Sequence, residues 1–289
     1  MSADEVLDLK KKILFLEEQL KLKSSEVLTY RQQLIKMSRQ LDSLMSEVSS
    51  DVEILAKLQK ILTPTEIPHL PGFEISRKFV YGSKSGGDYF DFFETKDKFQ
   101  FGFLVSASSN YNMSSLFLSL ILKMSHVLEA KKGGEPHQVL QKMSAELSAV
   151  ARPQDQTHVF YAMVDRRNFT MNFSSAGQIS GYYLSPDKSI RILKSSTGPL
   201  GTASDESLRS VKFELEPHSR LCVVTGGVAD LLGSDQIAQI MTGTAKQSVH
   251  DLRNELFFQA QKKSGLPDPE RDQTVVVIDV KDQVIKLAK

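Results

Sequence analysis

The stretch Gly86-Gly87-Asp88-Tyr89-Phe90-Asp91-Phe92 lies between two runs that read as strands, Phe73–Tyr81 and Phe99–Ala107. Gly-Gly-Asp is typical of a turn, because glycine adopts backbone conformations closed to other residues and aspartate bonds its own backbone. Short runs of β-branched and aromatic residues, bounded by Gly, Pro, Asp or Asn, indicate strands. The stretch therefore predicts a turn inside a domain that is rich in short strands.

Similar runs continue along the chain. The further predicted strands are His158–Val164, Phe169–Ser174, Gly181–Leu184, Ile190–Leu193, Val211–Leu215, Leu221–Thr225 and Val275–Val280. The predicted helices after the first are Met113–Ala130, Pro136–Val150, Gln236–Met241 and Ser248–Lys263. Short turns such as Asp165-Arg166-Arg167-Asn168 favour antiparallel hairpins. Because strands and helices are segregated, we expect an α+β fold of packed antiparallel sheets.

The first 62 residues differ in composition from the rest. They contain neither Gly nor Pro, whereas Pro64, Pro68, Pro71 and Gly72 follow within nine positions. Proline fixes φ and has no backbone N–H, so this cluster marks the end of a helix. The sequence therefore predicts two parts, a long coiled-coil helix at 1–62 and one domain at 63–289.

The predicted helix carries a narrow apolar stripe. Alternating steps of three and four from Val6 to Leu62 give 17 positions, of which 15 are apolar or aromatic; Lys23 and Asp51 interrupt it, as tolerated polar residues or as a register device. Such a stripe needs a partner helix, so we expect a parallel homodimer. The charges that attract across that pair are Glu5 with Lys10, Lys12 with Glu17, and Glu26 with Arg31. The predicted dimerisation residues are Ile13, Leu16, Leu20, Val27, Leu34, Leu41 and Leu44.

Composition excludes several classes of protein. The 36 Lys and Arg against 35 Asp and Glu argue against nucleic-acid and anionic-lipid partners. A single cysteine, Cys222, excludes an internal disulfide framework, and the six histidines, His158 among them, lack zinc-binding spacing. No apolar run of about 18 residues predicts membrane insertion. With no secretory pattern at the N-terminus, we expect a cytoplasmic protein.

Several motifs follow one another in a recognisable order. They are Leu58-Gln59-Lys60-Ile61-Leu62-Thr63-Pro64, the Gly86–Phe92 stretch, Ser175-Ala176-Gly177-Gln178, Thr197-Gly198-Pro199-Leu200-Gly201, Leu221–Val228 and Arg271–Val277. Over about residues 58–280 the chain resembles the SpoIIE/RsbU-like serine phosphatases, the bacterial branch of the metal-dependent PPM protein phosphatases. The resemblance implies a β-sandwich of two antiparallel sheets flanked by helices.

The resemblance also implies a metal site. Family members hold two Mn²⁺ or Mg²⁺ ions with carboxylates from four places, and the ions activate a water that attacks the phosphorus. Asp88 keeps its carboxylate, whereas the other three positions correspond to Leu104, Gly226 and Arg271. Acids that offer relocated ligands are Asp91, Asp165, Asp230 and Asp272. Because a guanidinium repels divalent cations and cannot be titrated away, we expect no metal cofactor.

The favoured hypothesis is a pseudophosphatase that acts as a dimeric binding protein in a partner-switching-like signalling pathway. The resemblance implies a regulatory phosphoprotein of the anti-sigma-antagonist kind as its partner, and Arg271 is a candidate contact for the phosphate. One alternative is an active phosphoserine or phosphothreonine phosphatase with an altered ligand set, which would use Mn²⁺ or Mg²⁺. Another is a structural protein that assembles through its coiled coil.

Overall fold

The computed structural model describes residues 3–62, 68–83, 87–108, 134–149, 151–152, 155–194, 197–201 and 208–281. The predicted helix Met113–Ala130 and residue Gly86 lie outside the described residues. The chain divides into two compact units, Met1–Ile54 and Leu55–Lys289. Of the helices that are described, none is both long enough and apolar enough to cross a membrane.

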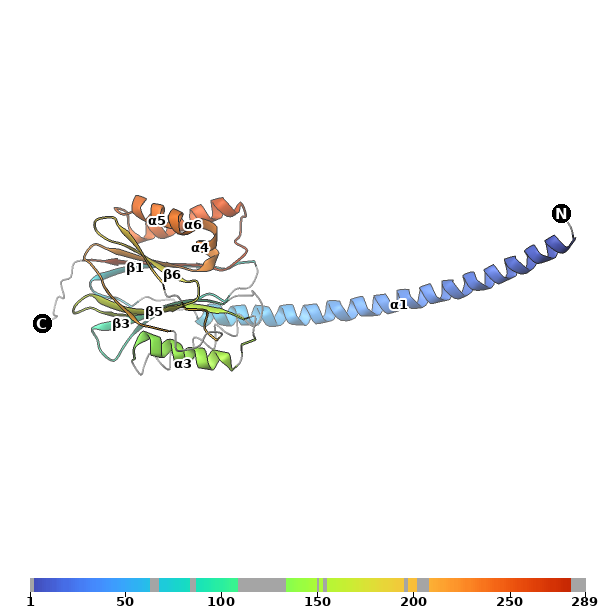
Figure 1. Cartoon of the computed structure of the whole chain (residues 1–289), viewed down its shortest axis with the longest axis horizontal. Coiled ribbons are helices and arrows are strands. Elements are labelled where there is room, and N and C mark those ends of the chain that lie inside the picture. The colour runs from blue at the N-terminus through green and yellow to red at the C-terminus, as the bar shows by residue number, and fades with distance from the viewer. Residues whose placement is uncertain are drawn as a thin grey trace. The chain divides into compact units, whose positions relative to one another are not determined.

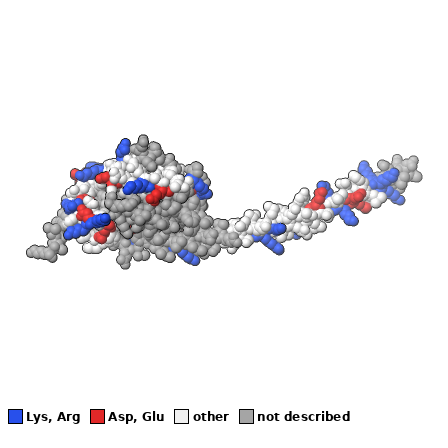
Figure 2. Space-filling model, turned by 90° about the horizontal axis from the view of Figure 1, so that it is seen from below, with Lys and Arg blue, Asp and Glu red and all other residues white. Residues whose placement is uncertain are grey.

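Helix α1 (Ala3–Leu62) provides the described part of the first unit (Figure 1). Its side chains are described over residues 10–46 and at Lys57. The seven residues expected to mediate dimerisation are all exposed in the single chain, by 54% at Ile13 to 75% at Leu20. Lys23, which interrupts the stripe, forms an exposed ion pair with Glu26 one turn later, at 2.8 Å. On the face that Figure 2 shows, basic and acidic side chains are mixed in the half of the helix toward its N-terminus.

The second unit contains two antiparallel sheets of five strands each among its described residues. The first sheet has the order β1 (Phe73–Val80), β10 (Gln273–Val280), β9 (Arg220–Val224), β6 (Ser180–Leu184), β7 (Ile190–Leu193). The second has the order β2 (Tyr89–Glu94), β3 (Gln100–Ser108), β4 (Thr157–Asp165), β5 (Thr170–Ala176), β8 (Val211–Glu214). The predicted α+β fold of two packed antiparallel sheets is confirmed.

Helices flank the sandwich on both sides (Figure 1). Helix α3 (Pro136–Ser148) packs on the outer face of the second sheet, and α4 (Gly226–Leu232), α5 (Ser234–Gly243) and α6 (Val249–Ser264) pack on the first. Ser248 and Asp251 form a capping box that begins α6, and Gly265 ends it in the left-handed conformation (φ 67°). The sequence predicts neither strand β2 nor helix α4, because β2 directly follows turn residues and α4 opens on two glycines, which disfavour helices.

The alternation of side chains along β10 explains how the first sheet packs against two layers at once. Val276 and Ile278 point into the core between the sheets, whereas Val275 and Val277 point to the helices that cover the first sheet. Every residue of β10 is buried, which explains its nearly unbroken apolar sequence. Burying one such side chain contributes about 1.5–3 kcal/mol.

A buried ion pair ties the first sheet to the loop between α5 and α6. Arg220 Nε donates to Asp279 Oδ1 at 2.5 Å, and its Nη2 donates to Asp279 Oδ2 at 2.8 Å. The guanidinium also donates to the carbonyl oxygens of Thr244 and Gln247. Because these donors are satisfied inside the fold, Arg220 can stay charged while buried.

Candidate functional site

A small pocket of about 30 Å³ opens at one end of the sandwich. It is lined by Asp88, Ala107, Ser108, His158, Gln178, Ile179, Gly226, Gly227, Arg271 and Asp272. These residues come from the start of β2, the end of β3, the start of β4, the β5–β6 turn, the start of α4 and the loop before β10. A cavity needs at least about 10–15 Å³ to hold a water, so this pocket is large enough for one.

Asp88 is held at the bottom of this pocket by two threonine hydroxyls. Thr225 Oγ1 donates to Asp88 Oδ2 at 2.5 Å, and Thr274 Oγ1 donates to the same oxygen at 2.8 Å. Thr225 follows β9 and Thr274 lies in β10, so the pairing of these two strands brings both hydroxyls together. The carboxylate oxygen therefore already accepts two hydrogen bonds from the protein.

Asp272 lies next to Asp88. The Asp88 N–H donates to Asp272 Oδ2 at 3.4 Å, and the Gly82 N–H donates to Asp272 Oδ1 at 2.9 Å. Burial raises the pKa of Asp88 well above its ordinary value, and the charge of Asp272 raises it further. The two threonine hydroxyls and the Arg271 charge oppose that rise in pKa. The net direction is a raised pKa, and burial is its largest cause.

Arg271 supplies the positive charge of the pocket. Its Nη1 pairs with Asp230 Oδ2 of α4 at 2.5 Å. A Cβ placed on Gly226 would lie 3.2 Å from Arg271 Nη2 and 3.5 Å from Asp230 Oδ2. The guanidinium therefore occupies the space into which an acidic side chain at position 226 would extend.

The fold divides the residues considered for the site into two groups of four. Asp88, Gly226, Arg271 and Asp272 line the pocket, whereas Leu104, Asp91, Asp165 and Asp230 do not; Asp165 lines another pocket, and Asp230 pairs with Arg271.

Leu104 is fully buried in the cluster under α3, with Leu140 and Tyr161. Leu104 does not line the pocket, which takes Ala107 and Ser108 from the end of β3. Asp91 pairs with Leu104 in the sheet and accepts a hydrogen bond from the Tyr89 hydroxyl at 2.8 Å. Both residues thus belong to the second sheet away from the pocket lining.

His158 is a pocket residue for which sequence reasoning predicts only a core or surface role. The Gln178 N–H donates to His158 Nδ1 at 3.3 Å, so that nitrogen is an acceptor and the ring proton lies on Nε2. Burial lowers the pKa of His158. Gly177 allows this packing because a Cβ there would lie 2.1 Å from the ring, and its φ of 75° suits glycine. The glycine of the Ser175–Gln178 motif is the sequence signal that leads to this histidine.

These side chains do not fit a Mg²⁺ or Mn²⁺ ion. Such ions prefer several carboxylate or carbonyl oxygens, and here one of the two acids, Asp88, accepts hydrogen bonds from two threonine hydroxyls while the permanent cation of Arg271 lies beside both acids. Within the described ranges, no cluster of three or more His, Cys, Asp or Glu side chains is placed to hold a metal ion. The donor set favours a hydrogen-bonded cluster over a metal centre.

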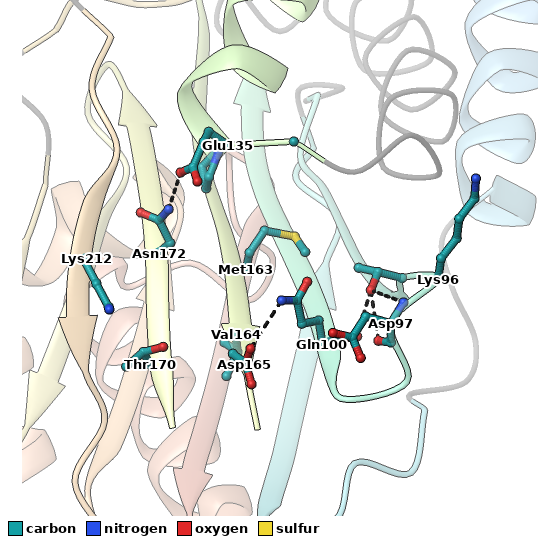
Figure 3. A pocket seen from close by; sticks show the side chains of 13 residues that line it. Lys96, Asp97, Gln100, Glu135, Met163, Val164, Asp165, Thr170, Asn172 and Lys212 are labelled. Atoms are coloured by element: carbon teal, nitrogen blue, oxygen red, sulfur yellow. Dashed lines mark hydrogen bonds between the residues drawn. The ribbon is translucent and has the colours of Figure 1, made fainter. Parts of the chain in front are cut away.

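A larger pocket of about 490 Å³ lies over the outer face of the second sheet (Figure 3). Its carboxylates are engaged: Asn172 donates to Glu135, and Gln100 Nε2 donates to Asp165 Oδ2 at 3.3 Å. Lys96 and Lys212 lie at opposite ends of the group in Figure 3. The lining of this larger pocket carries both positive and negative side chains and shows no nucleophile in contact with a base. The pocket beside Asp88 is therefore the better candidate site.

Residues 113–281 match the family model described as Stage II sporulation protein E (SpoIIE). The chain belongs to the SpoIIE family. Phosphoserine phosphatase RsbU of Bacillus subtilis (strain 168) is 22% identical over 191 residues, covering 66% of this chain and 56% of RsbU. The chain thus spans little more than half the length of that SpoIIE-family relative.

Solved structures share the SpoIIE-family fold. The SiaA-PP2C domain of Pseudomonas aeruginosa superposes with a TM-score of 0.67 at 17% identity, covering 82% of this chain and 98% of that domain. The RsbU and RsbW domains of Rv1364c from Mycobacterium tuberculosis superpose with a TM-score of 0.65 at 15% identity. The match covers 76% of this chain and 63% of that chain. At these identities the likeness establishes the fold alone.

Proposed function

We propose that this chain is a catalytically degenerate SpoIIE-type phosphatase that works as a dimeric signalling protein. One observation carries the proposal: Arg271 lies in the pocket with Asp88 and Asp272, paired with Asp230. A fixed guanidinium repels a divalent cation where a metal-dependent phosphatase needs negative charge.

The size of the expected loss in metal affinity supports this proposal. Even changes beside metal ligands lower affinity about 10–100-fold. Here the resemblance places Gly226 and Arg271 at two positions that carry acids in family members, and a Cβ at Gly226 would already touch the Arg271 side chain. Metal binding at ordinary cellular concentrations is therefore not expected.

The stripe of α1 supports pairing of two chains. Seven large apolar side chains at heptad spacing are exposed in the single chain. A parallel coiled coil buries them, and the flanking Glu26 and Arg31 then attract across the pair. We place the coiled coil at residues 1–62 and the binding domain at 63–289.

The proposed partner is a regulatory phosphoprotein. RsbU is named a phosphoserine phosphatase, and the Rv1364c structure joins RsbU and RsbW domains. By analogy the binding partner here would resemble the antagonist proteins of such switches. The Arg271 side chain is 39% exposed, so an anion at the pocket rim can reach its guanidinium.

Phosphatase assays test the proposal directly. Wild type and Asp88→Asn are incubated with p-nitrophenyl phosphate and a phosphoserine peptide in the presence of Mn²⁺, beside a SpoIIE-family phosphatase that turns both over. We expect equal, background rates for the two forms of this chain. Turnover by wild type that is lost in Asp88→Asn would instead establish the active alternative, which the closeness of Asp88 and Asp272 favours.

A further inference from the structure

The guanidinium of Arg271 is shared between the pocket and helix α4. Its Nη1 donates to Asp230 Oδ2 at 2.5 Å, and its Nη2 lies 3.2 Å from a Cβ built on Gly226. The side chains of Arg271 and Asp230 are 39% and 53% exposed. The ion pair therefore lies at the rim of the pocket, where water and a partner can reach both charges.

The backbone on both sides of this ion pair is closely packed. A Cβ on Gly82 would lie 2.4 Å from the carbonyl carbon of Arg271, and a Cβ on Gly227 would lie 2.0 Å from the carbonyl oxygen of Asp272. Gln273 Nε2 donates to the Gly227 carbonyl oxygen at 3.2 Å, which ties the loop before β10 to the first turn of α4. Because this packing leaves both backbone segments little room to shift, Arg271 can exchange partners only by rotation of its side chain.

Neither charge of the pair is fully hydrated. Partial burial raises the pKa of Asp230 and lowers the pKa of Arg271, because each ion loses part of its contact with water. An anion that replaced the Asp230 carboxylate at the guanidinium would leave Asp230 half-exposed, where water can hydrate it. A pair of this kind contributes little free energy, so an anion that binds the guanidinium better can displace it.

A phosphate needs the same edge of the guanidinium that Asp230 uses. Arginine binds phosphate most tightly through two parallel N–H donors, and Asp230 holds one of the two terminal nitrogens, Nη1. A phosphate carries more negative charge than a carboxylate and offers three oxygens. The phosphate and Asp230 therefore compete for Nη1, and Asp230 also repels an anion that approaches Nη2.

We propose that Asp230 is a built-in competitor for the anion site of Arg271 and lowers the affinity of the pocket rim for phosphate. A bound phosphate replaces the Asp230 carboxylate at Nη1, while the backbone of α4 and of the loop before β10 stays in place. This inference rests on the phosphate contact of Arg271 in the proposed function. It deepens that function because it assigns Asp230 the role of setting how tightly the contact holds.

Phosphate titrations of the full chain test the competition. Inorganic phosphate is added to wild type and to Asp230→Asn in EDTA at constant ionic strength, and calorimetry measures the dissociation constants. Asp230→Asn should bind phosphate about two- to fivefold more tightly, which matches the free energy of an exposed ion pair. Asp230→Ala should act in the same way, since alanine is a good helix former. Equal dissociation constants of wild type and both variants would overturn the competition.

Asp268→Asn is the matched control for charge. Asp268 is exposed, lies three positions before Arg271, and forms no ion pair among the described residues. The variant removes the same charge without removing a contact with Arg271, so it should bind phosphate as wild type does, because solvent and salt screen exposed charges. A gain in affinity as large as that of Asp230→Asn would show that net charge, and not the ion pair, controls phosphate binding.

The combination of Asp230→Asn with Arg271→Ala separates this inference from the proposed function. If Asp230 acts through Arg271, the double variant should bind phosphate no better than Arg271→Ala alone. Weaker binding by Arg271→Ala together with wild-type affinity in Asp230→Asn refutes the competition and leaves the phosphate contact standing. Phosphate binding that does not depend on Arg271 refutes both the contact and the competition.

Discussion

Arg271, on the loop before β10, forms an ion pair with Asp230 of α4, with 2.5 Å between Nη1 and Oδ2. The same guanidinium lies where a side chain at Gly226 would extend. A single arginine thus lines the pocket beside Asp88 and Asp272, and its charge opposes the rise in the pKa of Asp88. This relationship links the identity of residue 271 to the chemistry that the pocket can support.

Restoring two acids should restore metal binding. We expect wild type to melt at the same temperature in EDTA and in Mn²⁺, whereas Gly226→Asp combined with Arg271→Asp should melt several degrees higher in Mn²⁺. Binding at 100 times the dissociation constant contributes about 2.7 kcal/mol. Calorimetric melting curves measure the shift.

The matched control for metal binding is Gly226→Asp alone. It adds a carboxylate but keeps the guanidinium 3.2 Å from the new Cβ, so Mn²⁺ should leave its melting temperature unchanged. A rise in the wild-type melting temperature with Mn²⁺ would show that Arg271 does not keep divalent cations out of the pocket.

Arg271 should distinguish phosphorylated from unphosphorylated partner. If its exposed edge meets the phosphate, Arg271→Ala should weaken binding of a phosphorylated antagonist about tenfold or more, because charge-assisted bonds to phosphate contribute roughly 1.5–3 kcal/mol. Binding of the unphosphorylated form should not change. Titration calorimetry measures both; equal affinities of wild type and variant would remove Arg271 from partner binding.

We expect the buried ion pair of Arg220 and Asp279 to contribute more to stability than the half-exposed pair of Arg271 and Asp230. Arg220→Met leaves Asp279 buried without its partner, and removing one member of a buried pair costs about 3–5 kcal/mol. Asp230→Asn breaks a half-exposed pair, which should cost less than about 1 kcal/mol. Urea unfolding at pH 7 compares them, and a similar loss in both variants would show that burial is not the deciding factor.

The hairpin turn at Asp165 should give a pH-dependent contribution to stability. Hydrogen bonds from Arg167 lower the pKa of Asp165 from 3.8 to about 2. The ionised carboxylate therefore stabilises the fold above about pH 4, and this contribution is lost as the pH falls toward 2.

Comparison of Asp165→Asn with wild type isolates that contribution. The variant should be less stable by up to about 1 kcal/mol at pH 7, since Arg167 is half-exposed, and the difference should vanish near pH 2. Urea unfolding across this range measures it. A difference that stays constant from pH 7 to 2 would place the cause outside the titration of Asp165.

Apolar runs bounded by turn residues are enough to predict most strands. The predicted strand Val275–Val280 forms most of β10, because a strand buried on both faces has an apolar sequence whatever its neighbours are. Strand β2 is not predicted, since its aromatic residues directly follow turn residues. Motif correspondence does not fix which layer a strand residue faces, because a shift of one residue changes the face; the structure places Leu104 in the cluster under α3.

The sequence alone determined the long α1 helix and its apolar stripe, since heptad spacing and the lack of Gly and Pro act locally along one helix. It also determined the antiparallel β-rich class, and its motifs predict that Gly226 and Arg271 stand where family members carry acids. Only the tertiary structure decided which side chains meet: Thr225 and Thr274 around Asp88, Asp272 beside it, His158 in the same pocket, and Asp230 as the partner of Arg271. These contacts join residues up to 186 positions apart, and such distances are set by strand pairing and layer packing rather than by local sequence.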